Sequence, residues 1–217
     1  LRYYVGSALH SDAMRSEAFQ GLSEAILDQM LKGLQENPSA RIAFAEHAVS
    51  LPLRVNWGGG WSDTPPYCNE KGGTVLNAAI ELNGERPVSV KLTRLAEHKI
   101  VFDSRDMDVH GEFDRIEPLQ TVGDPFDPFV LQKAALLACG VIPSQGGDLE
   151  TVLTRLGGGF CMNTEVTGVP KGSGLGTSSI LAAACVKCLF EFLSISHTED
   201  DLYSHVLCME QIMSTGG

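Results

Sequence analysis

A loop rich in glycine and hydroxyl side chains is the stretch of this sequence best suited to chemistry. Residues 170–179 read Pro-Lys-Gly-Ser-Gly-Leu-Gly-Thr-Ser-Ser, and an apolar run with three alanines follows as a predicted helix start. Alternating glycines permit a tight turn with an uncovered backbone, and the first N–H groups of a helix carry partial positive charge. Such a loop is suited to holding an anion, most often phosphate, although a plain turn between a strand and a helix has a similar composition.

The glycine spacing excludes two widespread phosphate loops. A Walker-type loop ends in Gly-Lys-Ser/Thr, and the dinucleotide fingerprint is Gly-x-Gly-x-x-Gly, whereas these glycines are spaced two and two. We therefore take the whole loop as the candidate phosphate site: Lys171, Gly172, Ser173, Gly174, Leu175, Gly176, Thr177, Ser178 and Ser179.

A second cluster of polar and aromatic side chains follows a predicted strand. Arg54 and Asn56 lie on that strand, and three glycines lead from it to Trp61, Ser62 and Asp63. A carboxylate can bind vicinal sugar hydroxyls, and an aromatic ring can cover sugar C–H groups. We expect sugar binding here by Asn56, Trp61, Ser62 and Asp63, although an Asp after glycines is also ordinary turn chemistry.

A third candidate is Glu210, near the end of a helix predicted through Met213. A solvated helix residue is the simplest interpretation. A carboxylate beside a hydroxyl also suits Mg²⁺, which keeps several waters and binds phosphate oxygens. The six histidines show no ligand spacing, and we assign none of them a role.

The glycine-rich loop resembles the Pro-x-Gly-x-Gly-Leu-Gly-Ser-Ser-Ala pattern of the GHMP kinases, the superfamily of galactokinase, homoserine kinase, mevalonate kinase and phosphomevalonate kinase, with Thr177 at the first Ser. Arg54 and Asp63 have the spacing of the galactokinase sugar motif, but Gly60 and Trp61 replace its Glu-His. The form at 59–66 is instead similar to that of L-fucokinases, including the kinase part of plant bifunctional L-fucokinase/GDP-fucose pyrophosphorylases, and 72–77 continue it. Heptose-phosphate kinases share part of this motif but usually lack the Trp-Ser pair.

The resemblance implies ATP-dependent phosphorylation of L-fucose at its anomeric hydroxyl, giving L-fucose 1-phosphate in GDP-fucose salvage. It implies Mg²⁺ bound by Ser178 and Glu210, with Arg54 near the transferring phosphoryl group. The catalytic Asp is expected eleven positions after Glu210, beyond Gly217, so this stretch alone is expected to be inactive. The alternatives are another GHMP sugar or heptose-phosphate kinase, or a non-catalytic sugar- or nucleotide-binding relative. A pyrophosphorylase domain could be fused in the parent chain.

Composition limits the partners. The formal net charge of −11 argues against nucleic acid or an anionic membrane surface, and no apolar run is long enough to span a bilayer. The six scattered cysteines predict reduced thiols in a cytoplasmic protein, with a zinc site as a weaker alternative.

The order of predicted elements indicates an α+β fold. Residues 1–40 are predicted to be a helical connector with an apolar stripe at Leu22, Ile26, Met30 and Leu34. Residues 41–217 are predicted to form the N-terminal, ATP-binding half of a GHMP kinase, a ribosomal protein S5 domain 2-like mixed sheet with helices on one face. Within it we predict one strand from Val49 to Trp57, further strands at 74–80, 88–92, 99–102 and 160–165, and a surface hairpin at 103–114. Helices are predicted at 129–138, after the glycine-rich loop, and after Thr198.

Overall fold

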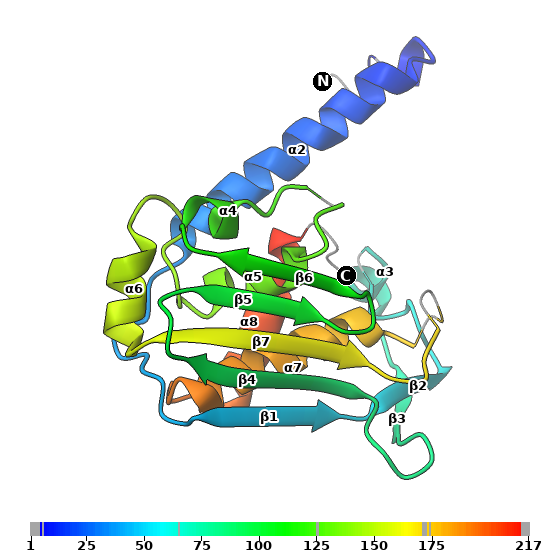
Figure 1. Ribbon diagram of the computed structural model, residues 1–217. Coiled ribbons are helices and arrows are strands. Elements are labelled where there is room, and N and C mark those ends of the chain that lie inside the picture. The colour runs from blue at the N-terminus through cyan, green and yellow to red at the C-terminus, as the bar shows by residue number, and fades with distance from the viewer. Residues whose placement is uncertain are drawn as a thin grey trace.

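The structure is a computed structural model that describes residues 5, 7–64, 66–124, 126–170, 173 and 175–213; the side chains at 15, 16, 18, 19, 22 and 23 lie outside this description. A five-stranded sheet forms the centre, and a separate two-stranded ribbon extends from one end of it (Figure 1). None of the helices that the structure describes is long and apolar enough to cross a membrane.

The main sheet is mixed, as predicted. Its strands lie in the order β1 (Glu46–Leu51), β4 (Val88–Leu95), β7 (Gly159–Val166), β5 (Ile100–Ser104) and β6 (Val109–Phe113). All neighbours are antiparallel except β5 and β7, which run parallel. Strands β4 and β5 therefore run in opposite directions, but β7 lies between them. A hairpin forms at the predicted place, but its first strand is β5, which begins at Ile100, before the predicted range of 103–114; its turn and β6 lie within that range.

Alternation along the strands buries one face of this sheet. In β4, Val88, Val90 and Leu92 are fully buried, whereas Lys91 between them is exposed. In β7, Phe160 and Met162 are fully buried in the same way. Each such side chain contributes about 1.5–3 kcal/mol through the apolar area it removes from water.

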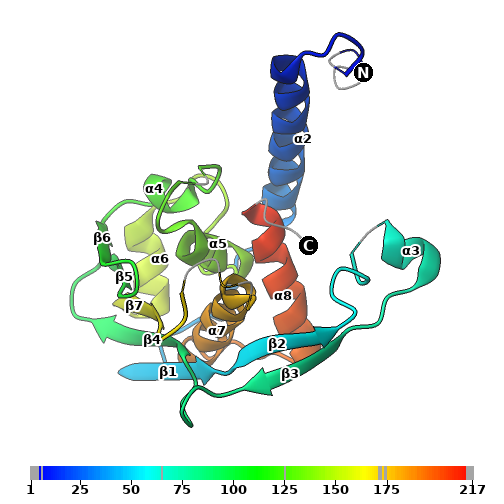
Figure 2. The ribbon, with the colours of Figure 1, turned by 90° about the vertical axis from the view of Figure 1, so that its right-hand side faces the viewer.

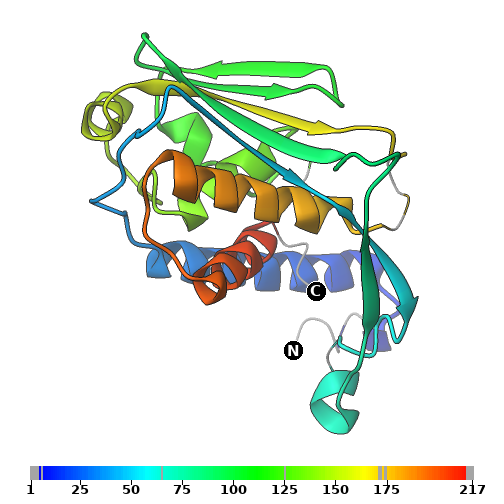
Figure 3. The same cartoon turned by 90° about the horizontal axis from the view of Figure 1, so that it is seen from below.

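The helices form layers below that buried face. Helix α7 (Thr177–Phe192) contacts β4 and β1 directly, and α8 (Glu199–Ile212) packs against α7 and α5 (Val130–Ala138) on the side away from the sheet (Figure 3). Because α7 lies between two layers, its small residues Ala182 and Ala184 are fully buried. These three helices confirm the sequence predictions.

Three shorter helices were not predicted. They are α3 (Tyr67–Lys71), α4 (Glu117–Gln120) and α6 (Leu149–Leu156). Helix α6 begins at an Asp148 side chain that accepts a hydrogen bond from the Thr151 N–H, and it ends at Gly157 in a left-handed conformation. These hydrogen bonds, first from the Thr151 backbone and then from its hydroxyl, lower the pKa of the Asp148 carboxyl. Helix α6 therefore has the usual cap residues at its two ends, Asp148 at the start and Gly157 at the end.

The two-stranded ribbon corrects the prediction of one strand from Val49 to Trp57. The chain instead forms β1 in the main sheet and β2 (Leu53–Gly58) in the ribbon, where β2 pairs antiparallel with β3 (Leu76–Ile80). Pro52 separates the two strands; proline has no N–H to continue a ladder, so the chain can change sheets there. Trp57 consequently lies 72% exposed on the ribbon instead of joining the core.

Helix α2 (Asp12–Gly33) projects away from the domain (Figure 2). Ser11 caps its first turn, and its last turns contact α8. Leu27, Leu31 and Leu34 pack against the core, whereas Ile26 is 47% exposed. The predicted stripe is therefore wrong at Ile26, and the side chain of Leu22 lies outside the described residues.

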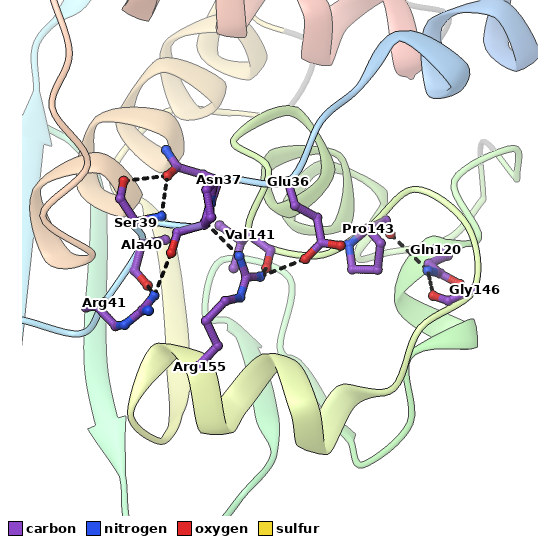
Figure 4. A network of polar contacts seen from close by, with 11 residues as sticks. Glu36, Asn37, Ser39, Ala40, Arg41, Gln120, Val141, Pro143, Gly146 and Arg155 are labelled. Carbon is purple, nitrogen blue, oxygen red and sulfur yellow. Dashed lines mark hydrogen bonds and ion pairs between the residues drawn. The ribbon is translucent and has the colours of Figure 1, made fainter.

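The segment after α2 is held firmly to the domain (Figure 4). Arg155 of α6 donates to the Asn37 carbonyl at 2.7 Å and the Val141 carbonyl at 2.8 Å, and it pairs with Glu36 at 3.0 Å. Ala40 is fully buried in the core. The connector thus packs onto the rest of the domain over its last residues, and the boundary between 1–40 and 41–217 stays a prediction.

Candidate active site

The glycine-rich loop lies between β7 and α7, as the sequence predicts. β7 ends at Val166 and α7 begins at Thr177. Ser173, Leu175 and Gly176 are described, whereas the candidate residues Lys171, Gly172 and Gly174 lie outside the described part of the loop. The phosphate-binding role of this loop stays a prediction, but its position at a helix start is established.

The start of α7 has no side-chain cap. Its N-cap residue is Gly176, with a left-handed φ of 67°. The first N–H groups of an α-helix have no partner within the helix, and here no side chain of the cap residue supplies one. An anion at this position would accept hydrogen bonds from those groups and would lie at the positive end of the helix dipole.

Arg54 connects the ribbon to this helix start. Its guanidinium lies over Gly176, because a Cβ built on Gly176 would be 3.3 Å from Arg54 Nη2 and 3.6 Å from Cζ. Strand β2, which contains Arg54, also contacts α7 (Figure 3). The structure therefore brings together two regions that the sequence singled out separately, and it places a permanent positive charge beside the uncapped helix.

Helix α8 approaches the same helix start from another side. The hydroxyl of Ser179 donates a hydrogen bond to a carboxylate oxygen of Glu210. The sequence analysis paired Glu210 with Ser178, but Ser178 borders a cavity together with Thr177. Successive helical residues point about 100° apart, so the neighbouring hydroxyls of α7 face different surroundings. Metal binding by Ser178 and Glu210 stays a prediction.

A cavity of about 330 Å³ opens beside these hydroxyls. We call it the core cavity, because main-sheet strands and core helices supply its walls. Leu131 of α5, Leu181 of α7 and Val166 at the end of β7 are among its apolar lining residues. Thr177 and Ser178 lie at its border, so an apolar space is continuous with the predicted phosphate loop.

A second cavity, of about 430 Å³, lies on the ribbon. We call it the ribbon cavity. Four of the predicted site residues line it: Arg54, Asn56, Trp61 and Asp63; Gly60, Thr64 and Val75 complete it. Trp61 is 84% exposed and has a left-handed φ of 69°, a conformation that costs a bulky residue about 1–2 kcal/mol. Strained, exposed aromatic residues of this kind are typical of binding loops.

Ser62 does not line the ribbon cavity. Its hydroxyl donates to the Gly59 carbonyl at 2.6 Å and accepts from the Thr74 N–H at 3.1 Å. It therefore ties the Trp61–Asp63 turn to the segment that leads into β3. The glycines permit this close approach, since a Cβ on Gly73 would lie 2.2 Å from the Ser62 carbonyl oxygen. Sugar contact by Ser62 stays a prediction, and the geometry favours a supporting role.

The residues near α7 fit Mg²⁺ only in part. Among the described residues, no group of three His, Cys, Asp or Glu side chains could hold a metal ion. One carboxylate and one hydroxyl, at Glu210 and Ser179, are hard oxygen donors of the kind Mg²⁺ accepts when phosphate oxygens and water complete its shell. The donor set is thus suited to a metal that arrives with a nucleotide.

The cysteines form no metal site. All six are free, and burial raises the pKa of the Cys188 thiol to about 12 and that of Cys185 well above its ordinary value. These thiols stay protonated at neutral pH and behave as core residues. The predicted reduced state agrees with the structure.

Comparisons with known proteins agree with what the geometry of the site indicates. A family model described as "GHMP kinases N terminal domain" matches residues 148–217, which include the glycine-rich loop, α7 and α8. The fold agrees with the mevalonate kinase of Methanococcus jannaschii, with a TM-score of 0.59 and 15% identity over 81% of this chain and 49% of that one. The chain belongs to the GHMP kinase superfamily.

Curated relatives of this GHMP kinase chain include two bifunctional proteins. The L-fucokinase/L-fucose-1-P guanylyltransferase of Bacteroides fragilis is 36% identical over 173 residues, covering 76% of this chain and 18% of that protein. The bifunctional fucokinase/GDP-fucose pyrophosphorylase of Arabidopsis thaliana is 37% identical over 205 residues, covering 91% and 18%. The D-glycero-alpha-D-manno-heptose 7-phosphate kinase of Campylobacter jejuni is 30% identical over 147 residues, covering 68% and 38%. The chain thus spans about a fifth of the length of the two bifunctional relatives.

Apart from Thr177 and Ser178, the residues of the core cavity were not predicted from the sequence. They come from the turn after β5 and the first turn of α5, including Asp106, Leu131 and Gln132. One signal was present in the sequence: Gln132 and Lys133 interrupt an otherwise apolar helix, and both prove to be buried. A buried polar pair inside an apolar run indicates a specific partner, because burial without one is unfavourable.

Proposed function

We propose that this GHMP kinase domain belongs to an enzyme that transfers the γ-phosphoryl group of ATP to the anomeric hydroxyl of L-fucose. The observation that supports the proposal best is the position of Arg54, which lies in the ribbon cavity and over Gly176 at the start of α7. A guanidinium in that position can contact a sugar on one side and a transferring phosphoryl group on the other.

The nucleotide is assigned to the region around α7. Its phosphates would accept hydrogen bonds from the uncapped N–H groups and from the loop of residues 171–179, and its base would enter the core cavity. Mg²⁺, when bound with the nucleotide, neutralises phosphate charge. We assign it to the oxygens near Glu210, with Ser178 or Ser179 as the hydroxyl partner.

The sugar is assigned to the ribbon cavity. Asp63 accepts hydrogen bonds from sugar hydroxyls, Asn56 can donate and accept, and the exposed ring of Trp61 covers the apolar side of the sugar. L-Fucose carries a methyl group, which an aromatic surface suits better than a polar one. Ser62 holds this loop in place through its bonds to Gly59 and Thr74.

Turnover would also use an acid–base residue, which we expect eleven positions after Glu210. Arg54 borders the ribbon cavity and lies beside Gly176, next to Thr177 of the core cavity, an arrangement that would support the alignment that in-line transfer requires. The names of the bifunctional relatives also support a fused pyrophosphorylase and a place in GDP-fucose salvage. These remain proposals, as does a cytoplasmic location.

The test measures sugar 1-phosphate formation by the full-length protein with Mg-ATP and, in turn, L-fucose, D-galactose and D-glycero-D-manno-heptose 7-phosphate. We expect kcat/KM for L-fucose to exceed the others by at least about a hundredfold, since a site built for one pattern of hydroxyls rejects another strongly. Preference for the heptose phosphate would establish the second candidate, which the similarity to the Campylobacter jejuni kinase supports. Binding of sugar and nucleotide without any turnover would establish the non-catalytic alternative.

A further inference from the structure

The core cavity has one buried polar group that the protein itself does not satisfy. Gln132 is 2% exposed on α5 and borders this cavity. Its Nε2 donates to the Thr164 hydroxyl at 3.2 Å. Among the described residues, Gln132 Oε1 is the one buried side-chain nitrogen or oxygen atom without a hydrogen-bond partner. An unsatisfied buried acceptor costs about 1–3 kcal/mol, so its retention calls for a partner.

The orientation of the Gln132 amide is held from the sheet side. Thr164 of β7 is fully buried and also bonds the hydroxyl of Ser104 on β5 at 3.2 Å. Three polar side chains from α5, β7 and β5 thus form a connected row. Because Thr164 occupies the amide nitrogen, the amide oxygen is the end left for a ligand.

The wall that contains Gln132 is also fixed. The next residue, Lys133, pairs with Asp127 at 2.5 Å, and the side chains are 8% and 14% exposed. Asp127 in turn accepts from the Phe129 N–H at 2.8 Å, which holds the segment around Pro128 against the cavity. The backbone that carries Gln132 is therefore held in place, so a ligand that reaches its amide oxygen would meet a preorganised acceptor.

We infer that Gln132 determines nucleotide specificity, its amide oxygen accepting a hydrogen bond from the exocyclic amine of adenine. The inference rests on the proposed function in that the core cavity receives the base while the phosphates lie at α7. The apolar lining residues Leu131, Val166 and Leu181 suit the faces of a purine, and a buried acceptor without a protein partner suits an amino group. Inosine triphosphate has an oxygen in place of that amine. The base oxygen and the Gln132 amide oxygen are both acceptors, so they could not form a hydrogen bond with each other.

The experiment compares the affinities of Mg-ATP and Mg-ITP for the full-length protein by calorimetry, in the wild type and in Gln132→Met. Met has a similar shape and removes the orphaned acceptor, so the variant should fold with unchanged or slightly higher stability, which urea unfolding checks. We expect the wild type to bind ATP about tenfold more tightly than ITP, and the variant to bind both with the weaker affinity.

Gln120→Met is the matched control. The Gln120 amide donates to the Pro143 and Gly146 carbonyls at the α4 end of the domain (Figure 4), away from the residues that line the core cavity. The control should keep the wild-type ratio of ATP to ITP affinity. If both Gln132→Met and Gln120→Met lost the preference for ATP over ITP, the inference would be overturned, because a general loosening of the domain would then explain the loss.

The other outcomes separate this inference from the function it rests on. Equal wild-type affinities, or a preference that survives in Gln132→Met, would overturn the role of Gln132 and leave nucleotide binding intact. Tighter binding of ITP would also overturn it, since the amide would then present its nitrogen. If neither nucleotide bound, both the inference and the proposed kinase function would be wrong.

Discussion

The two cavities of this domain are built in different ways. The core cavity is lined by residues of α5, α7 and β7, whose neighbours are buried in the hydrophobic core. The ribbon cavity lies on two strands outside the main sheet, and its lining residues Asn56, Trp61 and Asp63 are all exposed. One site is therefore part of what stabilises the fold, whereas the other is supported by local hydrogen bonds and glycine contacts.

This difference suggests that the two proposed substrates, sugar and nucleotide, would be recognised independently. Changes that break buried interactions around the core cavity should alter stability, because its lining residues are packed into the hydrophobic core. Changes at the exposed ribbon residues other than Arg54 should alter sugar binding with little effect on stability, since exposed loop residues contribute little to it. The four predictions below are in order of expected size: the first three test that separation, and the fourth tests the cap of α8.

The largest effect is expected at the buried ion pair beside the core cavity. Lys133→Met leaves Asp127 charged and largely buried, and Lys133 Nζ also lies 5.5 Å from the centre of the Phe113 ring. Breaking one side of such a pair costs about 3–5 kcal/mol, so the urea midpoint should fall strongly. Lys99→Met, which breaks the pair with Glu112 at the surface, should change it little. Recovery in Lys133→Met with Asp127→Leu would confirm the cause; an unchanged midpoint in the single variant would contradict it.

In the ribbon, Asp63→Ala should raise the KM for the sugar and lower kcat. Loss of a hydrogen bond to a charged group costs about 1.5–3 kcal/mol, which is roughly ten- to a hundredfold. The KM for ATP and the free energy of unfolding should stay at wild-type values, because Asp63 is exposed. Glu70→Ala, in the exposed helix α3, is the matched control. A weakened ATP site with normal sugar kinetics would remove the assignment of sugar to the ribbon.

A smaller effect is expected for Ser62→Ala. This change removes the hydroxyl that bonds Gly59 and Thr74, each bond contributing about 0.5–1.5 kcal/mol. We expect faster amide exchange at 59–64 and a severalfold weaker affinity for the sugar, with no change in nucleotide affinity. Ser62→Thr keeps the hydroxyl and should restore most of the difference. If Ser62→Ala abolished sugar binding as completely as Asp63→Ala with the exchange of the loop unchanged, Ser62 would be a sugar ligand.

The smallest effect concerns pH and helix α8. Hydrogen bonds, first from the Thr198 backbone N–H and then from its hydroxyl, lower the pKa of the Asp201 carboxyl. Because the pKa of Asp201 is lower in the folded state, the ionised carboxyl stabilises the fold at pH values above the ordinary Asp pKa. This stabilisation is lost as the pH falls through the pKa of Asp201 in the folded state. Urea unfolding between about pH 5 and pH 2 should therefore show a weaker decline for Asp201→Asn than for the wild type. Identical slopes would mean that this cap contributes nothing.

The sequence predicted the main layers because strong local signals set them. Alternation at 88–92, the apolar run at 130–138 and the Thr198 cap each act within a few residues, and each element formed where expected. The motifs also located most of the ribbon cavity, because Arg54, Asn56, Trp61 and Asp63 lie on one short stretch of chain.

What the sequence could not predict depends on contacts between distant segments. The split at Pro52 follows from which sheet each half can pair with, and an alternating pattern looks the same in either. The pairing of Glu210 with Ser179 instead of Ser178 depends on how α8 lies on α7. The core cavity combines residues from β5, α5, β7 and α7, and the buried pair at 132–133 gave a local sign of it.

Hydrogen–deuterium exchange of the full-length protein tests the separation of the two sites most directly. Ligand binding slows exchange where it suppresses local opening. Saturating L-fucose should protect peptides covering 53–64, and a non-hydrolysable Mg-ATP analogue should protect peptides covering 166–182 and 128–133, each with little effect on the other set except near Arg54. Protection of 53–64 by the nucleotide and of 166–182 by the sugar, or of one set by both ligands, would contradict the assignment of the two substrates.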